Sequence, residues 1–382
     1  MKIINLSSIA NPIIISVQNP SRSDYDRFIG LEHYDSGEPV ITRFQGTELL
    51  TTSAKAFKAN DILIARRNVY LKRAGIVFFD GITSGDSIIL RLKEDTQKTI
   101  GYSREDLIRY IPFMLNSEHF WIYANKHADG MNSKRISKDT LLEYEFELPS
   151  IDEMRDISDK LWAAYRLKEA YKKLLVTTDE MVKSQFIEMY YNTHNKQTLE
   201  SVCPIMSKGI TPKYVESSSV LVINQACIHW DGQRLGNIKY HNEEIPVRKR
   251  ILESGDVLLN ATGNGTLGRC CVFICPSDNN TYINDGHVIA LSTDRAVILP
   301  EVLNTYLSLN DTQAEIYRQY VTGSTNQVDI VFSDIKKMKV PVPSMDEQIL
   351  FVEVLKQADK SKFELKQCIE HIDKVIKSLI NG

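Results

Sequence analysis

One amphipathic pattern in the middle of the chain constrains the fold more than any other feature. Between Ile151 and about Tyr191, apolar residues recur mostly at steps of three or four, and no Pro or Gly interrupts them. This periodicity predicts a helix of about 60 Å, because each residue adds 1.5 Å. Such a length exceeds the usual globular range and favours a coiled-coil partner. The pattern returns over residues 346–380, so we expect the two helices to pair as an antiparallel coiled coil.

The regions that precede the two helices repeat each other. Three matches carry the repeat: FKANDIL at 57–63 with LESGDVL at 252–258, IPFMLN at 111–116 with LPEVLN at 299–304, and PSIDE at 149–153 with PSMDE at 343–347. The offsets are 195, 188 and 194 positions. Three collinear matches at nearly equal offset indicate a duplicated unit, with a period too long for a solenoid.

The sequence therefore predicts an α+β fold with two duplicated globular domains and pseudo-two-fold symmetry. The expected domains are residues 1–150 (globular), 151–193 (helix), 194–344 (globular) and 345–382 (helix). Within the first globular domain, apolar runs predict strands around 62–64, 75–79 and 87–90, and a helix over 104–120. A duplication of this kind suits a bipartite ligand, as a two-fold dimer suits two half-sites on duplex DNA.

Composition sets further limits. The chain of 382 residues is 43% hydrophobic and 25% charged, as in soluble globular proteins. It lacks an apolar window of eighteen residues and a signal-peptide layout, so we expect a cytoplasmic protein without a membrane partner. Its six cysteines do not follow a disulfide framework. The formal charge of −3 requires local basic patches for any nucleic-acid role.

The sequence lacks catalytic and cofactor-binding motifs in the structural context that they require. GNGTLG at 263–268 has the spacing of a dinucleotide fingerprint, but RCCVFICP follows it and predicts a strand instead of a phosphate-binding helix. Cys270, Cys271 and Cys275 have no second ligand pair at metal spacing. Nucleotide-binding, hydrolase and amino-methyltransferase motifs are missing as well. We therefore expect no catalytic residue, no cofactor and no metal, with Asp61 and Asp256 as structural groups at strand starts. An unrecognised enzymatic site at these two residues is the alternative.

Local basic and amide-rich loops favour DNA binding. RRNVYLKR at 66–73 gathers four cations around a tyrosine, whereas the matching loop at 260–269 is amide-rich with one arginine. Arginine reads guanine, Asn and Gln read adenine, and Lys and Arg hold phosphates. A basic loop alone is more often a solvated surface, but equivalent loops that diverge in polar content favour reading of different sequences. The candidate DNA contacts are Arg66, Arg67, Tyr70, Lys72, Arg73, Lys134, Arg135, Lys208, Lys213, Arg234, Arg248, Lys249, Arg250, Asn260, Asn264, Thr266, Arg269, Asn326 and Gln327.

Further motifs resemble those of a known family. They are IGLEHYDSG at 29–37, ESGDVLL at 253–259, GSTNQ at 323–327 and KVPVPSMDEQ at 339–348, with a weaker copy of the last at 147–153. With these motifs the chain resembles, over nearly its whole length, the specificity (S) subunit of type I restriction–modification systems. Two departures occur in the first domain. Ala59-Asn60-Asp61 stands where the second has Ser254-Gly255-Asp256, and KGITP at 208–212 has no close match, only Asn19-Pro20 near that place.

The resemblance implies two target-recognition domains that each read half of a split site on double-stranded DNA. It also implies that the paired helices act as spacers, dock methyltransferase subunits and allow restriction (translocase) subunits to join. The S subunit binds no S-adenosylmethionine and performs no chemistry in that family. A scaffold pseudo-dimer whose domains bind proteins is the alternative, because the net charge is nearly neutral. Salt-dependent binding to duplex DNA would distinguish the two.

Overall fold

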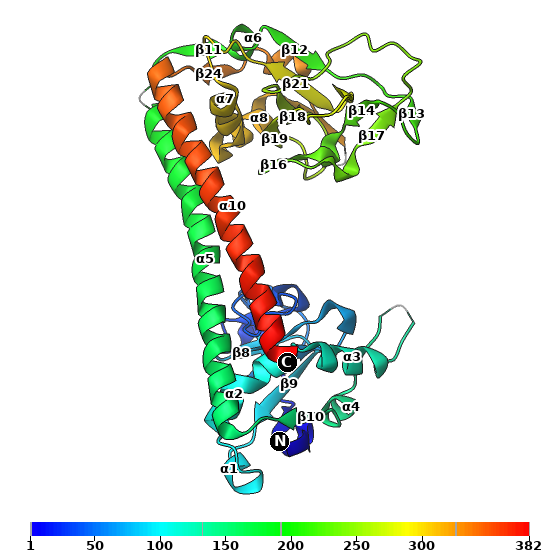
Figure 1. The fold of residues 1–382 in the computed structure, drawn as a ribbon, viewed down its shortest axis with the longest axis vertical. Coiled ribbons are helices and arrows are strands. Elements are labelled where there is room, and N and C mark those ends of the chain that lie inside the picture. Colours follow the sequence, from blue (N-terminus) through cyan, green and yellow to red (C-terminus); the bar gives the residue numbers. More distant parts are fainter. Residues whose placement is uncertain (1, 132, 192, 325–326, 382) are drawn as a thin grey trace. The chain divides into compact units, whose positions relative to one another are not determined.

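The computed structural model describes residues 2–131, 133–191, 193–324 and 327–381. The chain divides into two compact units, Met1–Lys173 with Leu365–Gly382, and Leu174–Glu364. Each unit contains a globular domain and part of both long helices, α5 (Ile151–Tyr191) and α10 (Met345–Asn381) (Figure 1). The helix α5 covers the range that its periodicity predicts.

Two four-stranded sheets build the first globular domain, in the orders β2-β9-β6-β7 and β3-β5-β8-β4. Apolar side chains of the first sheet and of the helices that follow it form one buried core. The predicted helix over 104–120 is two helices, because Ser117 starts a new one by accepting a hydrogen bond from Phe120 N. The elements are β1 (Lys2–Asn5), β2 (Ala10–Ile13), β3 (Ser16–Val17), β4 (Phe28–Ile29), β5 (Ala54–Phe57), β6 (Ile62–Ala65), β7 (Ala74–Ile76), β8 (Gly81–Thr83), β9 (Ser87–Leu92), α1 (Thr96–Thr99), α2 (Arg104–Met114), α3 (Glu118–Lys126), α4 (Lys138–Leu142) and β10 (Glu145–Leu148).

The second globular domain repeats one of these sheets and differs in the other, whose order is β13-β17-β14-β20. Its sheet β12-β21-β18-β19 corresponds strand for strand to β2-β9-β6-β7, and the pair β11–β24 corresponds to β1–β10. The internal duplication is thereby confirmed. The elements are β11 (Lys196–Thr198), α6 (Leu199–Val202), β12 (Ile205–Lys208), β13 (Tyr214–Val215), β14 (Val220–Ile223), β15 (Ile228–His229), β16 (Gly232–Gln233), β17 (Lys239–His241), β18 (Val257–Asn260), β19 (Cys270–Val272), β20 (Thr281–Asn284), β21 (Val288–Ser292), α7 (Pro300–Ser308), α8 (Asn310–Gln319), β22 (Val321–Ser324), β23 (Gln327–Ile330), α9 (Phe332–Ile335) and β24 (Lys339–Pro341).

One of the three sequence matches was placed in the wrong register. Pro112 lies near the C-terminal end of α2, whereas Pro300 is the first residue of α7. These two helices begin 196 positions apart, close to the offsets of the other matches. The pairing of IPFMLN with LPEVLN is therefore wrong by about two helical turns. Chemically similar residues recur within a helix, so a short match there does not fix the register.

The turn before the central strand explains the first departure from the family pattern. Asn60 and Gly255 both adopt left-handed backbone, with φ of 70° and 96°. Asn is one of the few residues other than Gly that tolerate this conformation. The next residue is buried in both domains. Asp61 accepts a hydrogen bond from Lys58 N and Asp256 accepts one from Glu253 N, so each carboxylate closes the turn.

The second departure is explained by strand register. Ile13 at the end of β2 pairs with Ile89, and Ser207 of β12 pairs with Ala290, the equivalent of Ile89. Residues 14–18 are therefore the counterpart of KGITP, and Asn19-Pro20 is not.

Both long helices begin with the same capping box. Ser150 Oγ donates to the Glu153 carboxylate, which also accepts from Ser150 N. Ser344 and Glu347 make the same two bonds. These bonds satisfy backbone donors that the helix leaves free, which explains why PSIDE and PSMDE recur at the two helix starts.

The long helices contact each other inside each unit. In the first unit, Leu161 of α5 and Ile376 of α10 share an apolar cluster. In the second unit, the rings of Phe186 and Phe351 lie 4.9 Å apart. Residue numbers rise along α5 as they fall along α10, so the pairing is antiparallel.

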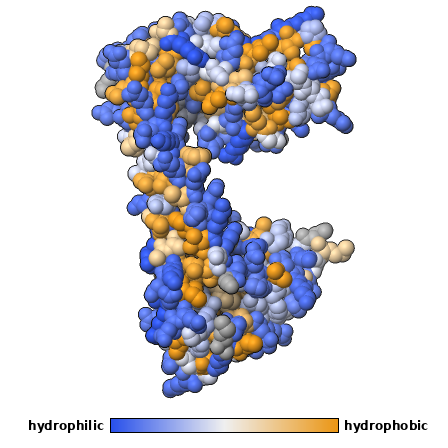
Figure 2. All heavy atoms as spheres, viewed as in Figure 1, coloured by the Kyte–Doolittle hydropathy of each residue, from blue (hydrophilic) through white to orange (hydrophobic). Residues whose placement is uncertain are grey.

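Apolar side chains are also exposed on both long helices, and Figure 2 shows apolar surface among polar surface on the helical part of the chain. The exposed group includes Leu174, Val176 and Met181 of α5, and Ile349, Leu350 and Phe363 of α10. Within the described residues, no helix carries an apolar stretch sufficient to cross a membrane.

Candidate nucleic-acid interface

The basic loop of the first domain presents only part of its charge to solvent. Asn68 and Lys72 adopt left-handed backbone on either side of a short 3-10 turn, and Val69 is buried beneath it. This geometry leaves Tyr70 60% exposed and Lys72 exposed beside it. A base can stack on a tyrosine ring and a lysine can hold phosphate, so the tip of the loop has the chemistry of a DNA contact.

Arg73 has a different position from the one that the sequence predicts. Its guanidinium donates to Leu31 O and Arg67 O at 3.0 and 3.1 Å, and these bonds hold the loop to the domain. Arg66 is half-buried, and its backbone bonds the neighbouring segments. Arg73 and Arg66 therefore support the loop more than they present charge.

Lys134 and Arg135 lie next to this loop. Asn68 N donates to Lys134 O at 2.8 Å, and Arg67 Nε donates to Ser133 Oγ at 2.9 Å. Arg67 and Arg135 lie 3.5 and 3.6 Å from the same carboxylate, that of Asp86. The structure thus brings two predicted basic segments together around an acidic residue that the sequence did not single out.

The matching loop of the second domain is built on glycines. Gly263, Gly265 and Gly268 all have positive φ, and β19 follows directly. The strand agrees with the prediction that GNGTLG is not a dinucleotide site. Asn264 is exposed at the tip, and Arg269 is half-buried at the end of the loop.

Asn260 and Thr266 hold this loop from inside. Asn260 has no exposed surface, and its amide donates to Gln225 O and Thr266 O. Thr266 Oγ1 donates to Thr262 O at 3.1 Å. The expectation that Asn260 touches DNA is therefore corrected, because a buried amide that fixes the loop cannot reach a base in this conformation.

The hairpin β22–β23 lies beside the glycine-rich loop. The backbones of Thr262 and Asp329 form an isolated β-bridge, and Ile330 N donates to Ala261 O at 2.8 Å. Lys208 Nζ pairs with Asp329 at 2.9 Å. Of the two predicted hairpin contacts, Asn326 lies outside the described residues, and the backbone of Gln327 begins β23.

A basic groove of about 760 Å³ opens in the second unit. It is lined by Lys208, Arg248, Lys249, Arg250 and Phe332, among others. Lys249 Nζ donates to Lys208 O and Gly209 O, and Arg250 pairs with Asp256 at 3.1 Å. Arg248 is exposed, so it is the groove cation best placed for a phosphate.

The remaining predicted cations do not line this groove. Lys213 is exposed, and its backbone N–H donates to His241 Nδ1. Arg234 is exposed and pairs with Asp231 at 3.1 Å. An exposed ion pair of this kind exchanges readily with solvent.

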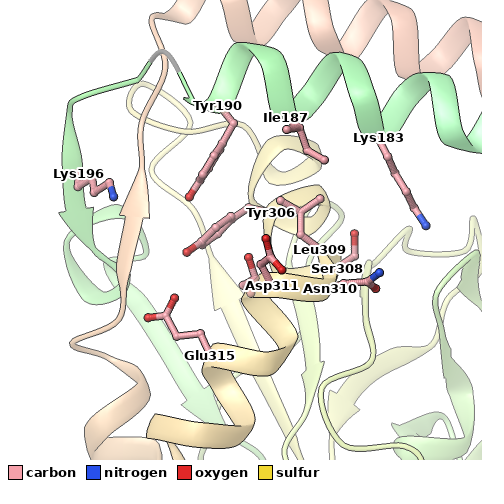
Figure 3. A pocket seen from close by; sticks show the side chains of 11 residues that line it. Lys183, Ile187, Tyr190, Lys196, Tyr306, Ser308, Leu309, Asn310, Asp311 and Glu315 are labelled. Atoms are coloured by element: carbon pink, nitrogen blue, oxygen red, sulfur yellow. The ribbon is translucent and has the colours of Figure 1, made fainter.

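Another cavity of the second unit, about 410 Å³, has a different character. Figure 3 shows Tyr190 and Tyr306 side by side in it, with rings stacked 5.0 Å apart. Its two lysines, Lys183 and Lys196, share the lining with the acidic Asp311 and Glu315. Mixed charge does not attract phosphate, and none of the predicted DNA contacts lines this cavity.

The buried aspartates have structural partners. Arg91 donates to both oxygens of Asp61 at 2.7 Å, and Ser292 Oγ donates to Asp256 at 2.6 Å. These contacts, together with the turn bonds, use the acceptor positions of carboxylates that have almost no exposed surface. The contacts of Asp61 and of Asp256 therefore support a structural role for these residues over an enzymatic one.

Comparison with known proteins agrees with this architecture. A model of the type I restriction modification DNA specificity domain matches residues 195–373. Residues 195–373 are therefore similar to a type I restriction–modification DNA specificity domain. The matched range holds the glycine-rich loop, the basic groove and the β22–β23 hairpin. The resemblance seen in the sequence is confirmed.

Solved structures extend the likeness in fold to the whole chain. A chain from a study of complex assembly and conformational transition of the type I R-M system aligns with a TM-score of 0.59 at 15% identity, over 99% of this chain and 96% of that one. The type I S subunit from M. genitalium aligns with a TM-score of 0.53 at 13% identity, over 100% and 96%. A search of curated protein sequences gave no match. The chain therefore shares its overall fold with these two solved structures.

Proposed function

We propose that the chain is the non-catalytic DNA-specificity subunit of a type I restriction–modification complex. Each globular domain reads one half of a bipartite site on double-stranded DNA. The paired helices set the gap between the half-sites. Methylation and cleavage take place in partner methyltransferase and restriction subunits.

One observation carries this proposal. The two domains share the strand order of one four-stranded sheet and the backbone bonds around the candidate loops, yet the polar residues of these loops differ. Tyr70, Lys72 and Lys134 are exposed in the first domain, whereas in the second Asn264 is exposed and Arg269 is half-buried. A pure scaffold has no reason to keep the loop framework and change its polar groups, whereas two readers of different half-sites do.

The long helices supply the proposed docking surface for methyltransferase subunits. Their exposed apolar residues include Val176, Met181 and Phe363. A partner subunit that covers these side chains removes apolar surface from water, which favours docking there.

Binding to DNA tests the proposal directly. The full-length chain, assembled with its methyltransferase subunits, is titrated with duplex DNA at several salt concentrations. We expect sequence-selective binding whose affinity falls steeply with salt, because each phosphate contact releases counterions. Salt-insensitive binding without sequence preference would favour the scaffold alternative.

Mapping of methylated bases is the second measurement. We expect two short defined sequences separated by a gap of undefined sequence. A single continuous site would contradict the division between two domains.

A further inference from the structure

Three chain segments meet at the same topological position in both domains. In the first domain they are the residues after β6, the β8–β9 turn and the segment after α3. Arg66 N donates to Asp86 O at 2.9 Å, and Ile136 N donates to Arg66 O at 3.0 Å. Arg67 forms an isolated β-bridge with Arg135 between the first and third of these segments. We name this meeting point the junction.

The second domain contains the same junction bond for bond. Ala261 N donates to His287 O and Ile330 N donates to Ala261 O, both at 2.8 Å. Thr262 bridges Asp329, as Arg67 bridges Arg135. The equivalent positions are therefore 67 and 262, 86 and 287, and 135 and 329.

The side chains at these positions differ completely. In the first domain, Asp86 lies between Arg67 and Arg135, whose side chains are 42% and 46% exposed. Lys55 Nζ donates to Gly85 O and Ser87 O, which fixes the turn that carries Asp86. Two guanidinium groups are thus held partly exposed around one carboxylate.

In the second domain no arginine occupies these three positions. His287 Nδ1 lies 3.0 Å from Thr262 Oγ1. Asp329 is 45% exposed and is held by Lys208. The partly exposed groups are now a hydroxyl, an imidazole and a carboxylate.

We propose that Asp86 and His287 determine base specificity at equivalent positions of the two domains. Asp86 orients Arg67 and Arg135 toward guanine, whose O6 and N7 accept a bidentate arginine. His287 orients Thr262 beside Asp329, whose carboxylate accepts from the amino group of cytosine. Asp86 is a positioning residue, because it acts through the two arginines. This inference rests on the proposed DNA-reading function and adds which residues discriminate bases within it.

Selection from a library of duplexes, with each position of the recognised site randomised in turn, tests the inference. The probe is applied to the full-length chain assembled with its methyltransferase subunits. For Asp86→Asn, we expect the guanine preference at one position of one half-site to weaken roughly tenfold or more, the range for loss of one bidentate contact. The other half-site stays unchanged, and Asp86→Glu restores the preference in part. For His287→Ala, we expect a change confined to the other half-site.

Asp26→Asn is the matched control. Asp26 lies 3.9 Å from Arg27 in the same domain, but at an exposed site outside the junction. The base preferences of the Asp26→Asn variant should equal those of the original chain. If Asp86→Asn fails to fold, Arg67→Gln and Arg135→Gln keep Asp86 and remove one guanidinium each, and at least one of them must weaken the guanine preference.

Several outcomes overturn the inference. They are unchanged preferences in the junction variants, a uniform loss of affinity for all sequences, or changes by both variants in the same half-site. If the original chain already shows no sequence preference, the proposed function itself fails. If it shows two half-sites and the junction variants are silent, only the role of the junction fails.

Discussion

Lys168 of α5 and Asp373 of α10 form an ion pair, with 2.5 Å between Nζ and Oδ1. Lys362 of α10 and Asp179 of α5 form the corresponding pair at 2.9 Å. Each residue of the second pair is 194 positions from its counterpart in the first. Such reciprocity is the property of an isologous interface between two copies, here contained in one chain. The helix pairing was therefore duplicated together with the domains.

The two pairs should differ in their effect on stability. Lys168 also binds Glu38 at 2.6 Å, and the side chains of Lys168 and Glu38 are 9% and 14% exposed. We expect Lys168→Met to lower the free energy of unfolding by about 2 kcal/mol, because it leaves a largely buried carboxylate with fewer partners. Lys362→Met, at a 23% exposed lysine with a 54% exposed partner, should cost less than about 1 kcal/mol. Urea unfolding of both variants checks this order, and equal losses would contradict it.

The contact between α2 and α5 should lose stability in acid. Hydrogen bonds from Arg155 lower the pKa of Asp106, burial opposes the shift, and Ser103 adds to it. Because the folded pKa lies below the unfolded value of 3.8, the stabilisation is complete above that value and is lost as pH falls through the folded pKa. Asp106→Asn should therefore flatten the dependence of the urea midpoint on pH below about 4. Asp139→Asn, at a 73% exposed side chain, serves as the control and should follow the original chain.

Asp61 should matter for folding and not for chemistry. The Asp61 side chain is 1% exposed, and its two carboxylate oxygens accept hydrogen bonds from Nε and Nη2 of Arg91. We expect Asp61→Ala to destabilise the chain by about 3 kcal/mol, since it leaves Arg91 without its partner. At a temperature where the variant is folded, the complex should methylate the same sequence at the same rate. Lost methylation by a fully folded variant would support the enzymatic alternative.

The exposed loop residues should act on separate half-sites. We expect Lys72→Ala with Lys134→Ala to weaken binding at one half-site, because both side chains are exposed in the first domain. Asn264→Ala with Arg269→Ala should affect the other. Competition binding with duplexes that carry one altered half-site measures each effect. Equal losses at both half-sites from either variant would contradict the division.

The helices should act as a ruler. Both pass from one unit to the other near Lys173 of α5 and Glu364 of α10. Insertion of about one turn at both points adds roughly 6 Å, so the gap in the methylated site should change by about two base pairs. The same insertion in the exposed loop at 216–219 is the control and should leave the gap unchanged. An unchanged gap after the helix insertion would exclude the ruler.

The sequence predicted those features that depend on local chemistry. Helix periodicity placed α5, and the Pro-Ser-x-Asp-Glu motif recurred visibly in the sequence because each helix start needs Ser and Glu at the fixed spacing of a capping box. The duplication was visible in the sequence because short motifs of this kind recur in both halves. What failed was register within a helix, where Pro112 and Pro300 were matched although they occupy different positions.

The candidate interface was less predictable, because residue type does not tell which way a polar side chain points. Arg73 and Asn260 have the chemistry of DNA contacts, yet they hold their own loops. Asp86 and His287 were missed because each is a lone polar residue in a short turn. The turns are also offset by 201 positions, unlike the 194 to 195 of their neighbours. Only the matched backbone bonds reveal that they are equivalent.

The first unit ends with residues 365–382, almost two hundred positions after its main part. In that unit Ile376 packs on Leu161, and Asn381 Oδ1 accepts from Glu118 N at the start of α3. During synthesis the helix pairing of the first unit can therefore form only after residues 365–382 have been translated. At about 10 residues per second, this delay is on the order of 20 seconds. A stop codon just before residue 365 would thus remove helix contacts from the unit whose main part is translated first.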